Sequence, residues 1–340
     1  MLADKYVDAH KTPNGPGDAR PTALQIIEDE GLTGKLSDKV IFITGASSGI
    51  GVETARALHK TGAHLYFGVR NTEQGRKVAD EILADGGPGK IDVLEIDLSS
   101  LESVRKCAGE FKKKSKQLNV LINNAGIMAC PEGKTKDGFE LQFGTNHLGH
   151  FLLFQLLKDV LLASSTPAFN SRVVSLSSSA HRISSVDFNN INFENGGYDM
   201  WKSYGQSKTA NIHFSNEVDR RYGSQGLHST SVHPGGIMTE LQRHLPPGVV
   251  DSWKTPELHA IFKSPEQGAA TTVWAAVSKD LEGKGSMHLD NVSITPQQTP
   301  EQAKAGAFGR HSGHADYAFD QDAELKLWNL SNKFVGFEEN

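Results

Sequence analysis

Short apolar runs alternate with helical patterns through residues 39–289, and this alternation limits the possible folds more than any other feature of the chain. The runs span residues 39–43, 64–69, 91–96, 119–122, 172–176, 227–232 and 286–289. Short, mostly apolar runs are typical of parallel strands that are buried on both faces. Helices between successive strands complete right-handed crossovers. The sequence therefore predicts an α/β fold with one doubly wound parallel sheet of about seven strands and helices on both faces.

A glycine-rich turn follows the first run. Residues 44–51 read Thr-Gly-Ala-Ser-Ser-Gly-Ile-Gly and lead into a helical pattern that continues to Leu58. Glycines in a strand-to-helix turn let the main chain approach a pyrophosphate, and the helix N-terminus offers free N–H groups and the positive end of its dipole. The turn therefore predicts a phosphate site of the Rossmann type; an ordinary glycine-rich turn is the alternative.

The end of the second run bears on which dinucleotide would bind. In folds of this type a carboxylate at that position bonds the ribose 2′-hydroxyl and repels a 2′-phosphate. Here Val69 is followed by Arg70 and Asn71, with no carboxylate. A planar guanidinium pairs well with a phosphate. We interpret Arg70 as favouring NADP over NAD, the alternative being a solvent-facing strand end.

Polar residues follow two further runs. Asp97, before Leu98, is placed either to bond an adenine amino group or to cap the next helix. Residues 123–126 read Asn-Asn-Ala-Gly, in which amides can bridge neighbouring loops and the small pair lets a cofactor lie close. Asn146 lies inside one long helix predicted over residues 138–164. Because asparagine is a poor helix former, we expect its side chain there either to be exposed or to serve a function in the site.

The strongest chemical motif is Tyr204-x-x-x-Lys208. Residues four apart lie on one face of a helix, and here they open a helix predicted to run to about Tyr222. A cation beside a phenol favours the phenolate and lowers its pKa, which suits proton exchange with a carbonyl/alcohol couple. The motif alone also occurs on solvated helix faces. Before it, residues 177–179 place a serine hydroxyl at the carboxyl end of the fifth run, where open α/β sheets bind ligands.

Composition excludes several classes of function. A net charge of -5 does not suggest a nucleic-acid-binding surface. The two cysteines have no metal-ligand spacing, and we expect no metal; His147 and His150 are expected to pack or to face solvent. No apolar run approaches the ~18 residues that would span a membrane. Without a secretory pattern at the N-terminus, the expected location is cytoplasmic.

The ends of the chain are expected to differ from its centre. Residues 1–36 form an N-terminal extension, with a flexible or surface-draped arm over about residues 1–20 and a short helix capped by Thr22. Residues 37–340 form a single domain. Within it we expect a substrate lid at about residues 240–264 and a C-terminal segment at about residues 290–340, with a short helix near residues 322–335.

In combination, these motifs resemble those of the short-chain dehydrogenase/reductase family, and the resemblance covers nearly all of the chain after about Ser37. Six patterns occur in the family's order: Thr44-Gly45-x-x-x-Gly49-Ile50-Gly51, Asn123-Asn124-Ala125-Gly126, Asn146, the serine cluster, Tyr204-x-x-x-Lys208 and Pro234-Gly235-x-Ile237-x-Thr239. The chain is most similar to the retinol dehydrogenase and WW-domain oxidoreductase branch, through residues 124–131 and 146–151 and the wide gap between Ser178 and Tyr204. The sequence shows no pattern of a WW module or of the membrane anchor of the microsomal retinol enzymes, so we expect neither and do not expect retinoid substrates.

The resemblance implies a role for each matched residue. Tyr204 is the general acid, Lys208 lowers its pKa and holds the nicotinamide ribose, and Ser178 aligns the carbonyl, with Ser177 as the alternative one residue earlier. Asn146 is expected to seat a water that links Lys208 to solvent. The implied cofactor-binding residues are Gly45, Ser47, Ser48, Gly49, Ile50, Gly51, Arg70, Asp97, Leu98, Asn124, Ala125, Gly126, Tyr204, Lys208, Pro234, Gly235, Ile237 and Thr239.

The function implied is NADPH-dependent reduction of a carbonyl, or the reverse oxidation of an alcohol, on a lipophilic small molecule. Apolar residues expected in part to wall its pocket are Ile183, Val186, Phe188, Tyr198, Met200 and Trp201. Two alternatives keep the fold: non-redox chemistry such as dehydration, epimerisation or cyclisation, and a non-catalytic NADP-binding regulator. Homo-oligomers are common in the family, although the C-terminal segment is long enough to cover the usual contact surface.

Overall fold

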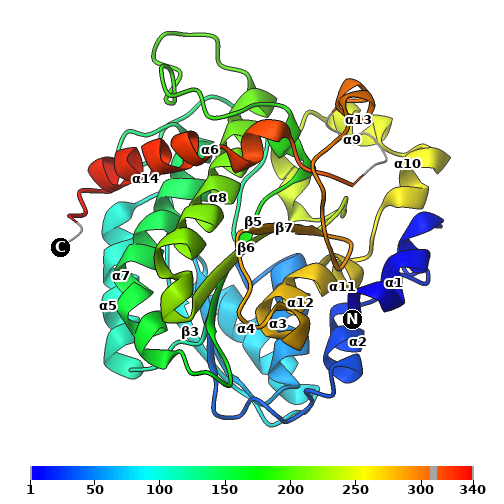
Figure 1. Ribbon diagram of the computed structural model, residues 1–340, viewed down its shortest axis with the longest axis vertical. Coiled ribbons are helices and arrows are strands. Elements are labelled where there is room, and N and C mark those ends of the chain that lie inside the picture. Colours follow the sequence, from blue (N-terminus) through cyan, green and yellow to red (C-terminus); the bar gives the residue numbers. More distant parts are fainter. Residues whose placement is uncertain (1, 307–311, 339–340) are drawn as a thin grey trace.

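An eight-stranded sheet forms the centre of the computed structural model, which describes residues 2–306 and 312–338 (Figure 1). The strands are β1 (Val40–Thr44), β2 (His64–Val69), β3 (Lys90–Glu95), β4 (Val120–Asn123), β5 (Ser171–Leu176), β6 (Leu227–His233), β7 (Met287–Asp290) and β8 (Ser293–Ile294). They lie in the order β3-β2-β1-β4-β5-β6-β7-β8, and the first seven in the chain are parallel. The predicted α/β fold is confirmed. Parts of the predicted C-terminal segment, residues 307–311 and 339–340, lie outside the described residues.

The eighth strand is an addition to the predicted sheet. β8 has two residues and pairs antiparallel with β7. Asn291 and Val292 between them both have a positive φ of 55°, which is the conformation of a two-residue type I′ hairpin. The sequence shows no glycine at this turn and β8 is very short, so neither feature is visible as a strand pattern.

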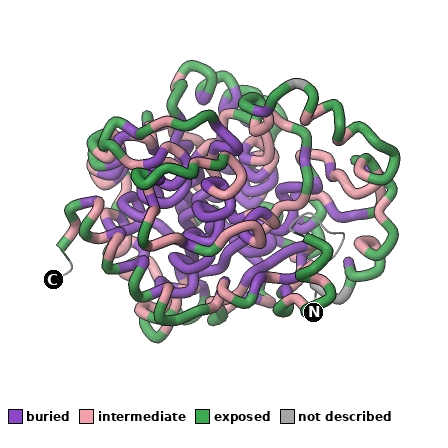
Figure 2. Tube along the Cα trace, turned by 90° about the horizontal axis from the view of Figure 1, so that it is seen from above, coloured by how far each residue is buried: buried purple, intermediate pink, exposed green. Residues whose placement is uncertain are grey.

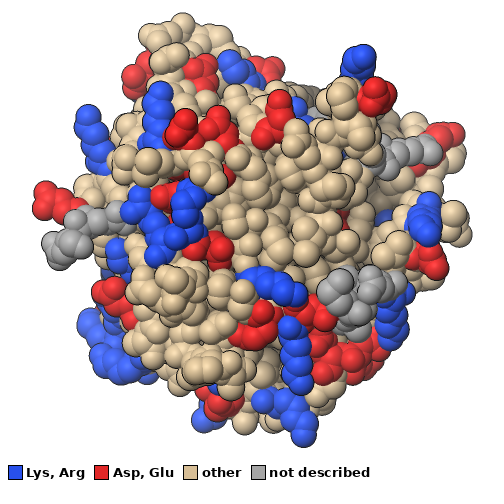
Figure 3. Space-filling model, viewed as in Figure 1, with Lys and Arg blue, Asp and Glu red and all other residues tan. Residues whose placement is uncertain are grey.

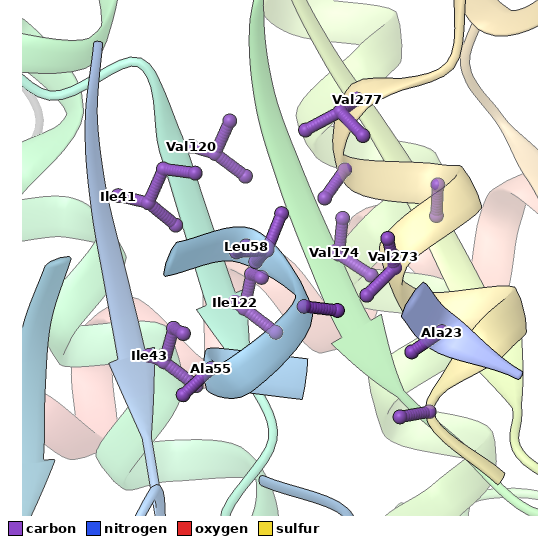
Figure 4. Packing of buried hydrophobic residues seen from close by; sticks show 14 of the residues in the cluster. Ala23, Ile41, Ile43, Ala55, Leu58, Val120, Ile122, Val174, Val273 and Val277 are labelled. Atoms are coloured by element: carbon purple, nitrogen blue, oxygen red, sulfur yellow. The ribbon is translucent and has the colours of Figure 1, made fainter. Parts of the chain in front are cut away.

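Helices cover both faces of the sheet because alternate strand residues point to opposite sides. Ile41 and Ile43 of β1 join one apolar cluster, and Val40 and Phe42 join the other. The first cluster takes residues from α2 (Ala23–Asp29), α3 (Ile50–His59), α4 (Thr72–Ala84) and α12 (Ala270–Val277). The second takes residues from α5 (Leu101–Lys114), α7 (Gly149–Ser164), α8 (Met200–Tyr222) and α14 (Gln321–Val335). Helix α11 (Pro265–Gly268) contacts α3 and α12. Figure 4 shows side chains of the first cluster packed between helices and strands, and Figure 2 shows the buried residues concentrated in the middle of the molecule.

Two helices of the structure differ in detail from the helices predicted from the sequence. The helix predicted over residues 138–164 begins only at α6 (Leu141–Phe143), continues as a π-helical turn (Gly144–Leu148) and then becomes α7. Asn146 lies in this π turn, a feature often found at functional sites. Helix α8 begins four residues before Tyr204, because the Asp199 side chain accepts from the main-chain N–H groups of Trp201 and Lys202.

Of the two alternatives predicted for residues 1–20, a flexible or a surface-draped arm, the surface-draped one agrees with the structure, where most of residues 5–19 are exposed or half-buried; the helix within it is not predicted. Helix α1 (Leu2–Lys11) packs its Tyr6 with 3% exposure, and Arg20 is 4% exposed. The Arg20 guanidinium pairs with Asp18 and donates to the main-chain carbonyls of Ile261 and Phe262. Polar tertiary contacts of this kind leave no periodic pattern in the sequence. The predicted helix after Thr22 is confirmed as α2, with Thr22 as its cap.

The C-terminal helix α14 lies across α7 and α8 (Figure 1). Its Trp328, 1% exposed, stacks on Phe214 of α8 and meets Phe151 of α7 edge-on. Its Glu324 pairs with Arg220 and accepts from the Asn216 amide. The helix predicted near residues 322–335 is confirmed, and it covers the outer surface of α7 and α8.

The surface carries mixed charges. On the face drawn in Figure 3, basic and acidic side chains are interspersed. Within residues 2–306 and 312–338, the structure has no helix with the length and apolar character needed to cross a membrane. Short helices complete the upper rim in Figure 1: α9 (Pro247–Ser252), α10 (Pro256–Ile261) and α13 (Pro300–Lys304).

Candidate active site

A cavity of about 940 Å³ lies at the carboxyl ends of the parallel strands. All the residues predicted to bind the cofactor line it, as do both candidate serines: Gly45, Ser47, Ser48, Gly49, Ile50, Gly51, Arg70, Asp97, Leu98, Asn124, Ala125, Gly126, Ser177, Ser178, Tyr204, Lys208, Pro234, Gly235, Ile237 and Thr239. Asn146 does not line it, because this side chain is fully buried behind the cavity wall. The loops after β1 to β6 thus bring the separate motifs of the sequence into one site.

The glycine-rich turn is shaped for a phosphate group. Gly45 has a φ of +71°, and a Cβ there would lie 2.9 Å from the Cα of Ala125. At Gly51, the first turn of α3, a Cβ would lie 2.3 Å from the Gly45 carbonyl oxygen. No side chain caps α3 at Gly49, so the N-terminal N–H groups of this helix are available to a ligand. These residues fit the pyrophosphate of a dinucleotide.

A buried histidine connects this turn to the middle of the site. Burial lowers the pKa of His150 to about 4, so the imidazole is neutral. Its Nδ1 lies 2.9 Å from the Asn146 carbonyl and donates to it, which leaves Nε2 to accept from the Thr44 hydroxyl, also at 2.9 Å. The Thr44 oxygen in turn accepts from the N–H groups of Asn124 and Ala125. The prediction that His150 packs is confirmed, and its contacts hold the loop after β4 against β1.

Asn146 supports the same loop from the other side. Its amide accepts from the Ile127 N–H and donates to the Ile127 carbonyl, both at 2.9 Å, and to the Ser207 hydroxyl at 3.0 Å. Both amide hydrogens are therefore used by the protein. A Cβ at Gly126 would lie 3.3 Å from Asn146 Oδ1 and 3.5 Å from Lys208 Nζ, so glycine there lets both groups reach the cavity wall. That Asn146 seats a water stays a prediction.

Tyr204 and Lys208 are both buried at the centre of the site, with exposures of 3% and 4%. The Lys208 ammonium lies 5.5 Å from the centre of the Tyr204 ring and donates to the Leu176 carbonyl at 3.1 Å. Burial raises the pKa of Tyr204 to about 12 and lowers the pKa of Lys208 to about 8. The expected lowering of the Tyr204 pKa does not appear: loss of hydration raises this pKa, and a hydrogen bond with Ser178 opposes the rise.

The two candidate serines have different partners. The Ser177 hydroxyl is 3% exposed and donates to the Lys208 carbonyl at 2.9 Å, which fixes α8. The Ser178 oxygen accepts from the Ala180 N–H at 3.1 Å, which leaves its hydrogen for Tyr204 or for a ligand. Between the two alternatives, this geometry favours Ser178 as the serine that meets a carbonyl.

The predicted adenosine residues lie at the far end of the cavity. Arg70 is exposed at the end of β2 and lines the cavity. The Asp97 carboxylate accepts from the Ser99 N–H and hydroxyl and pairs with Lys136 at 3.1 Å. The alternative role of Asp97 as a helix cap is wrong, because the Ser100 side chain caps α5.

The end of the cavity beside Tyr204 is apolar. Met128, Leu245 and Tyr204 pack together with Trp201, Leu241 and Trp253. Of the six residues proposed between Ser178 and Tyr204, Trp201 lines the cavity; Val186 and Phe188 instead pack in the core beneath α8. The segment 240–264 contributes Leu241, Val249 and Trp253 to the wall.

The comparison with known families identifies the family of this fold. The sequence profile described as short chain dehydrogenase matches residues 39–249, more than half of the chain. This chain belongs to the short-chain dehydrogenase family. Members of this family are oxidoreductases that bind a nicotinamide cofactor, which accords with the dinucleotide-shaped turn described above.

Individual relatives place the chain within the family. The short-chain dehydrogenase/reductase prx1 of Penicillium roqueforti is 51% identical over 336 residues, covering 98% of this chain and 96% of that protein. Human retinol dehydrogenase 11 is 40% identical over 262 residues, covering 77% of this chain and 80% of that protein. A crystal structure of an uncharacterised Mycobacterium paratuberculosis protein matches with a TM-score of 0.65 and 34% identity over 88% of this chain and 94% of that one. The predicted resemblance to the retinol dehydrogenase and WW-domain oxidoreductase branch is confirmed.

Several cavity residues of this short-chain dehydrogenase were not found by sequence reasoning. His10 and Arg20 come from the N-terminal extension, His233 ends β6, and Lys263 follows α10. These residues are far apart in the chain and belong to no common motif. The only available sign was the position of His233 at the end of a strand, where ligand sites of open α/β sheets lie.

Proposed function

We propose that this short-chain dehydrogenase reduces a carbonyl on a lipophilic small molecule with NADPH, or oxidises the corresponding alcohol. The observation that carries the proposal is the pairing of Ser178 and Tyr204 in one cavity with the dinucleotide-shaped turn. The apolar surroundings of Tyr204 support a lipophilic substrate. A cytoplasmic location and the oligomeric state stay predictions from the sequence.

The proposed mechanism assigns one task to each side chain. Because the pKa of Tyr204 is about 12, its phenol is protonated at neutral pH and can donate a proton to the carbonyl oxygen. The Ser178 hydroxyl donates a second hydrogen bond to that oxygen and orients it. Lys208 has two ammonium hydrogens beyond the one bonded to the Leu176 carbonyl, and we assign these to ribose hydroxyls of the cofactor. When bound, the reduced nicotinamide supplies the hydride.

The experiment that tests this proposal is spectrophotometric. Oxidation of NADPH is followed with a panel of aromatic, steroid-like, polyketide-like and aldehyde carbonyls, with NADH in parallel. Turnover on any of them supports carbonyl reduction. NADPH binding without turnover on any of them would contradict the proposed reaction and favour non-redox chemistry on this fold.

We expect Arg70→Asp to reverse the cofactor preference. The change replaces a guanidinium that pairs with the 2′-phosphate by a carboxylate that repels it and can bond a 2′-hydroxyl. The ratio of kcat/KM with NADPH to that with NADH should fall by about 10²-fold or more, since charge-assisted hydrogen bonds contribute about 1.5–3 kcal/mol and repulsion adds to the loss. Arg76→Asp, at an exposed position of α4 outside the cavity, is the matched control. An unchanged ratio would show that Arg70 does not meet the 2′-phosphate.

We expect the rate of reduction to decline in alkaline solution. Burial lowers the pKa of Lys208 to about 8, so this residue is cationic below that pH and neutral above it. Because the ammonium holds the ribose and supports a forming phenolate, kcat/KM should be constant below pH 8 and fall above it. Lys208→Arg, whose guanidinium keeps its charge, should lose this inflection. A wild-type profile that stays flat to about pH 10 would contradict the assigned role.

A further inference from the structure

A group of polar side chains lines the cavity apart from its apolar end. We call Arg182, His233, Lys263, Asp290 and Ser312 the polar subsite. The Ser312 hydroxyl donates to Asp290 at 3.0 Å, and Arg182 donates to the carbonyl of the next residue, Gly313, also at 3.0 Å. His233 of β6 is the register partner of Asp290 in β7, and the charges of Asp290, Lys263 and Arg182 affect the pKa of His233. The subsite thus joins the ends of β6 and β7 to the C-terminal segment.

Lys263 is the central feature of the polar subsite. Its side chain is built into the loop after β6: the Lys263 N–H donates to the Gly236 carbonyl at 2.8 Å, and a Cβ at Gly235 would lie 2.8–3.0 Å from the Lys263 stem and ammonium. Gly235 has a φ of +103°, which a larger residue would rarely adopt. The position of this lysine is therefore fixed by the fold.

The Lys263 ammonium has fewer partners than a buried charge normally has. The residue is 4% exposed, and its ammonium makes one hydrogen bond, to the Pro234 carbonyl at 3.3 Å. Within the described residues, no carboxylate lies within 4.0 Å of it. An ammonium has three hydrogens to donate, and a buried one is normally ion-paired. Two donors of Lys263 therefore remain for a ligand in the cavity.

His233 provides a further donor beside Lys263. Its Nδ1 accepts from the Ser179 N–H at 3.2 Å, so the neutral ring carries its hydrogen on Nε2. Burial and the neighbouring cations lower the pKa of His233 to about 4, which keeps the ring neutral. Ser179 directly follows Ser178, so this contact places the polar subsite next to the serine that meets the carbonyl.

Among the described residues, the charged side chains of the polar subsite are those of Lys263, Arg182 and Asp290. The Lys263 ammonium has two hydrogens beyond the one bonded to the Pro234 carbonyl. A buried ammonium with donors left over favours an anionic group on the ligand.

We propose that the polar subsite binds a carboxylate carried by the substrate, with Lys263 as its ion-pair partner and His233 Nε2 as a second donor. The apolar end beside Trp201 and Trp253 then holds the hydrocarbon part. This proposal rests on the proposed carbonyl reduction and deepens it, since it makes the substrate an oxo acid rather than a neutral ketone.

The test compares oxo acids with their methyl esters. A series of aliphatic oxo acids of graded chain length, each with its ester, is assayed with NADPH. The wild-type protein should prefer at least one acid over its ester by about tenfold or more in kcat/KM, as expected for a charge-assisted contact. Lys263→Met, which keeps the length of the side chain and removes the charge, should bring the acid-to-ester ratio close to one. Lys279→Met, at an exposed lysine outside the cavity, should keep the wild-type ratio.

A second measurement uses only the wild-type protein. Fatty acids should inhibit the wild-type reduction of an ester about tenfold more strongly than the alcohols of the same chain length. Equal inhibition by acids and alcohols, or equal turnover of acids and esters, would overturn the carboxylate subsite while leaving carbonyl reduction intact.

Failure of the proposed reductase activity can be distinguished from failure of the polar subsite. If the wild type reduces neither acids nor esters, the proposed reaction fails, but the subsite is still tested by thermal unfolding. A fatty acid should then raise the Tm of the wild type more than the matching alcohol does, and this difference should disappear in Lys263→Met. No difference in the wild type would overturn the subsite.

Discussion

Replacing Tyr204 with phenylalanine is expected to lower kcat/KM for carbonyl reduction by about 10²–10⁴-fold, the range that general acid catalysis contributes. The change removes one oxygen and keeps the ring, whose centre lies 6.4 Å from that of Trp201 and 5.5 Å from the Lys208 ammonium. The phenol hydroxyl that the proposed mechanism uses as its proton donor is therefore lost.

The measurement is steady-state reduction of the best substrate from the carbonyl panel, together with NADPH binding by fluorescence. Binding should stay nearly unchanged, since the wall for the dinucleotide is formed mainly by the glycine-rich turn and the loop after β4. Tyr222→Phe, at the other end of α8 and outside the cavity, is the matched control and should keep full activity. Substantial residual turnover in Tyr204→Phe would remove Tyr204 from the proposed role.

The second large effect is on stability. Trp328→Ala should destabilise the protein by about 3–5 kcal/mol, the usual cost of deleting a buried tryptophan. Trp328 is 1% exposed and fills the contact between α14, α7 and α8, where its ring centre lies 5.0 Å from that of Phe151 and 6.3 Å from that of Phe214. The Arg221 guanidinium lies 4.6 Å from the ring centre and also loses this contact.

Urea or thermal unfolding measures this effect. Leu325→Ala, on the same helix at 46% exposure, should change the free energy of unfolding by less than about 0.5 kcal/mol. None of the α14 residues lines the cavity, so the folded fraction of Trp328→Ala should keep its kcat/KM. A loss below about 1 kcal/mol would mean that α14 contributes little to the stability of the α7–α8 surface.

The motifs of this site could be found in the sequence because each depends on local geometry. Gly45 and Gly51 are required by a strand-to-helix turn whose main chain has no room for a Cβ, and this requirement fixes their spacing. Tyr204 and Lys208 share a helix face, so their separation of four residues is also a local property. Because parallel strands end at one edge of the sheet, a sequence that predicts the strands also predicts that these motifs meet there.

The protonation of these residues could not be predicted in the same way. The sequence indicates that Lys208 lies near Tyr204, and from this a lowered pKa was expected. Burial of the phenol raises the pKa instead, and burial depends on side chains from several distant segments, including Met128 and Trp253. The loss of hydration depends on all the neighbouring side chains together, so the resulting pKa shift cannot be predicted from any single motif.

The sequence by itself determined the α/β class, the parallel sheet, and the positions of the proposed cofactor-binding and catalytic motifs, because these follow from periodicity and from local steric requirements. Only the tertiary structure decided the course of the N-terminal extension, the π turn that carries Asn146, the covering of α7 and α8 by α14, and the polar subsite around Lys263. Each of these depends on contacts between residues far apart in the chain. Such contacts are set by the folded shape as a whole and leave no periodic or local pattern in the amino-acid sequence.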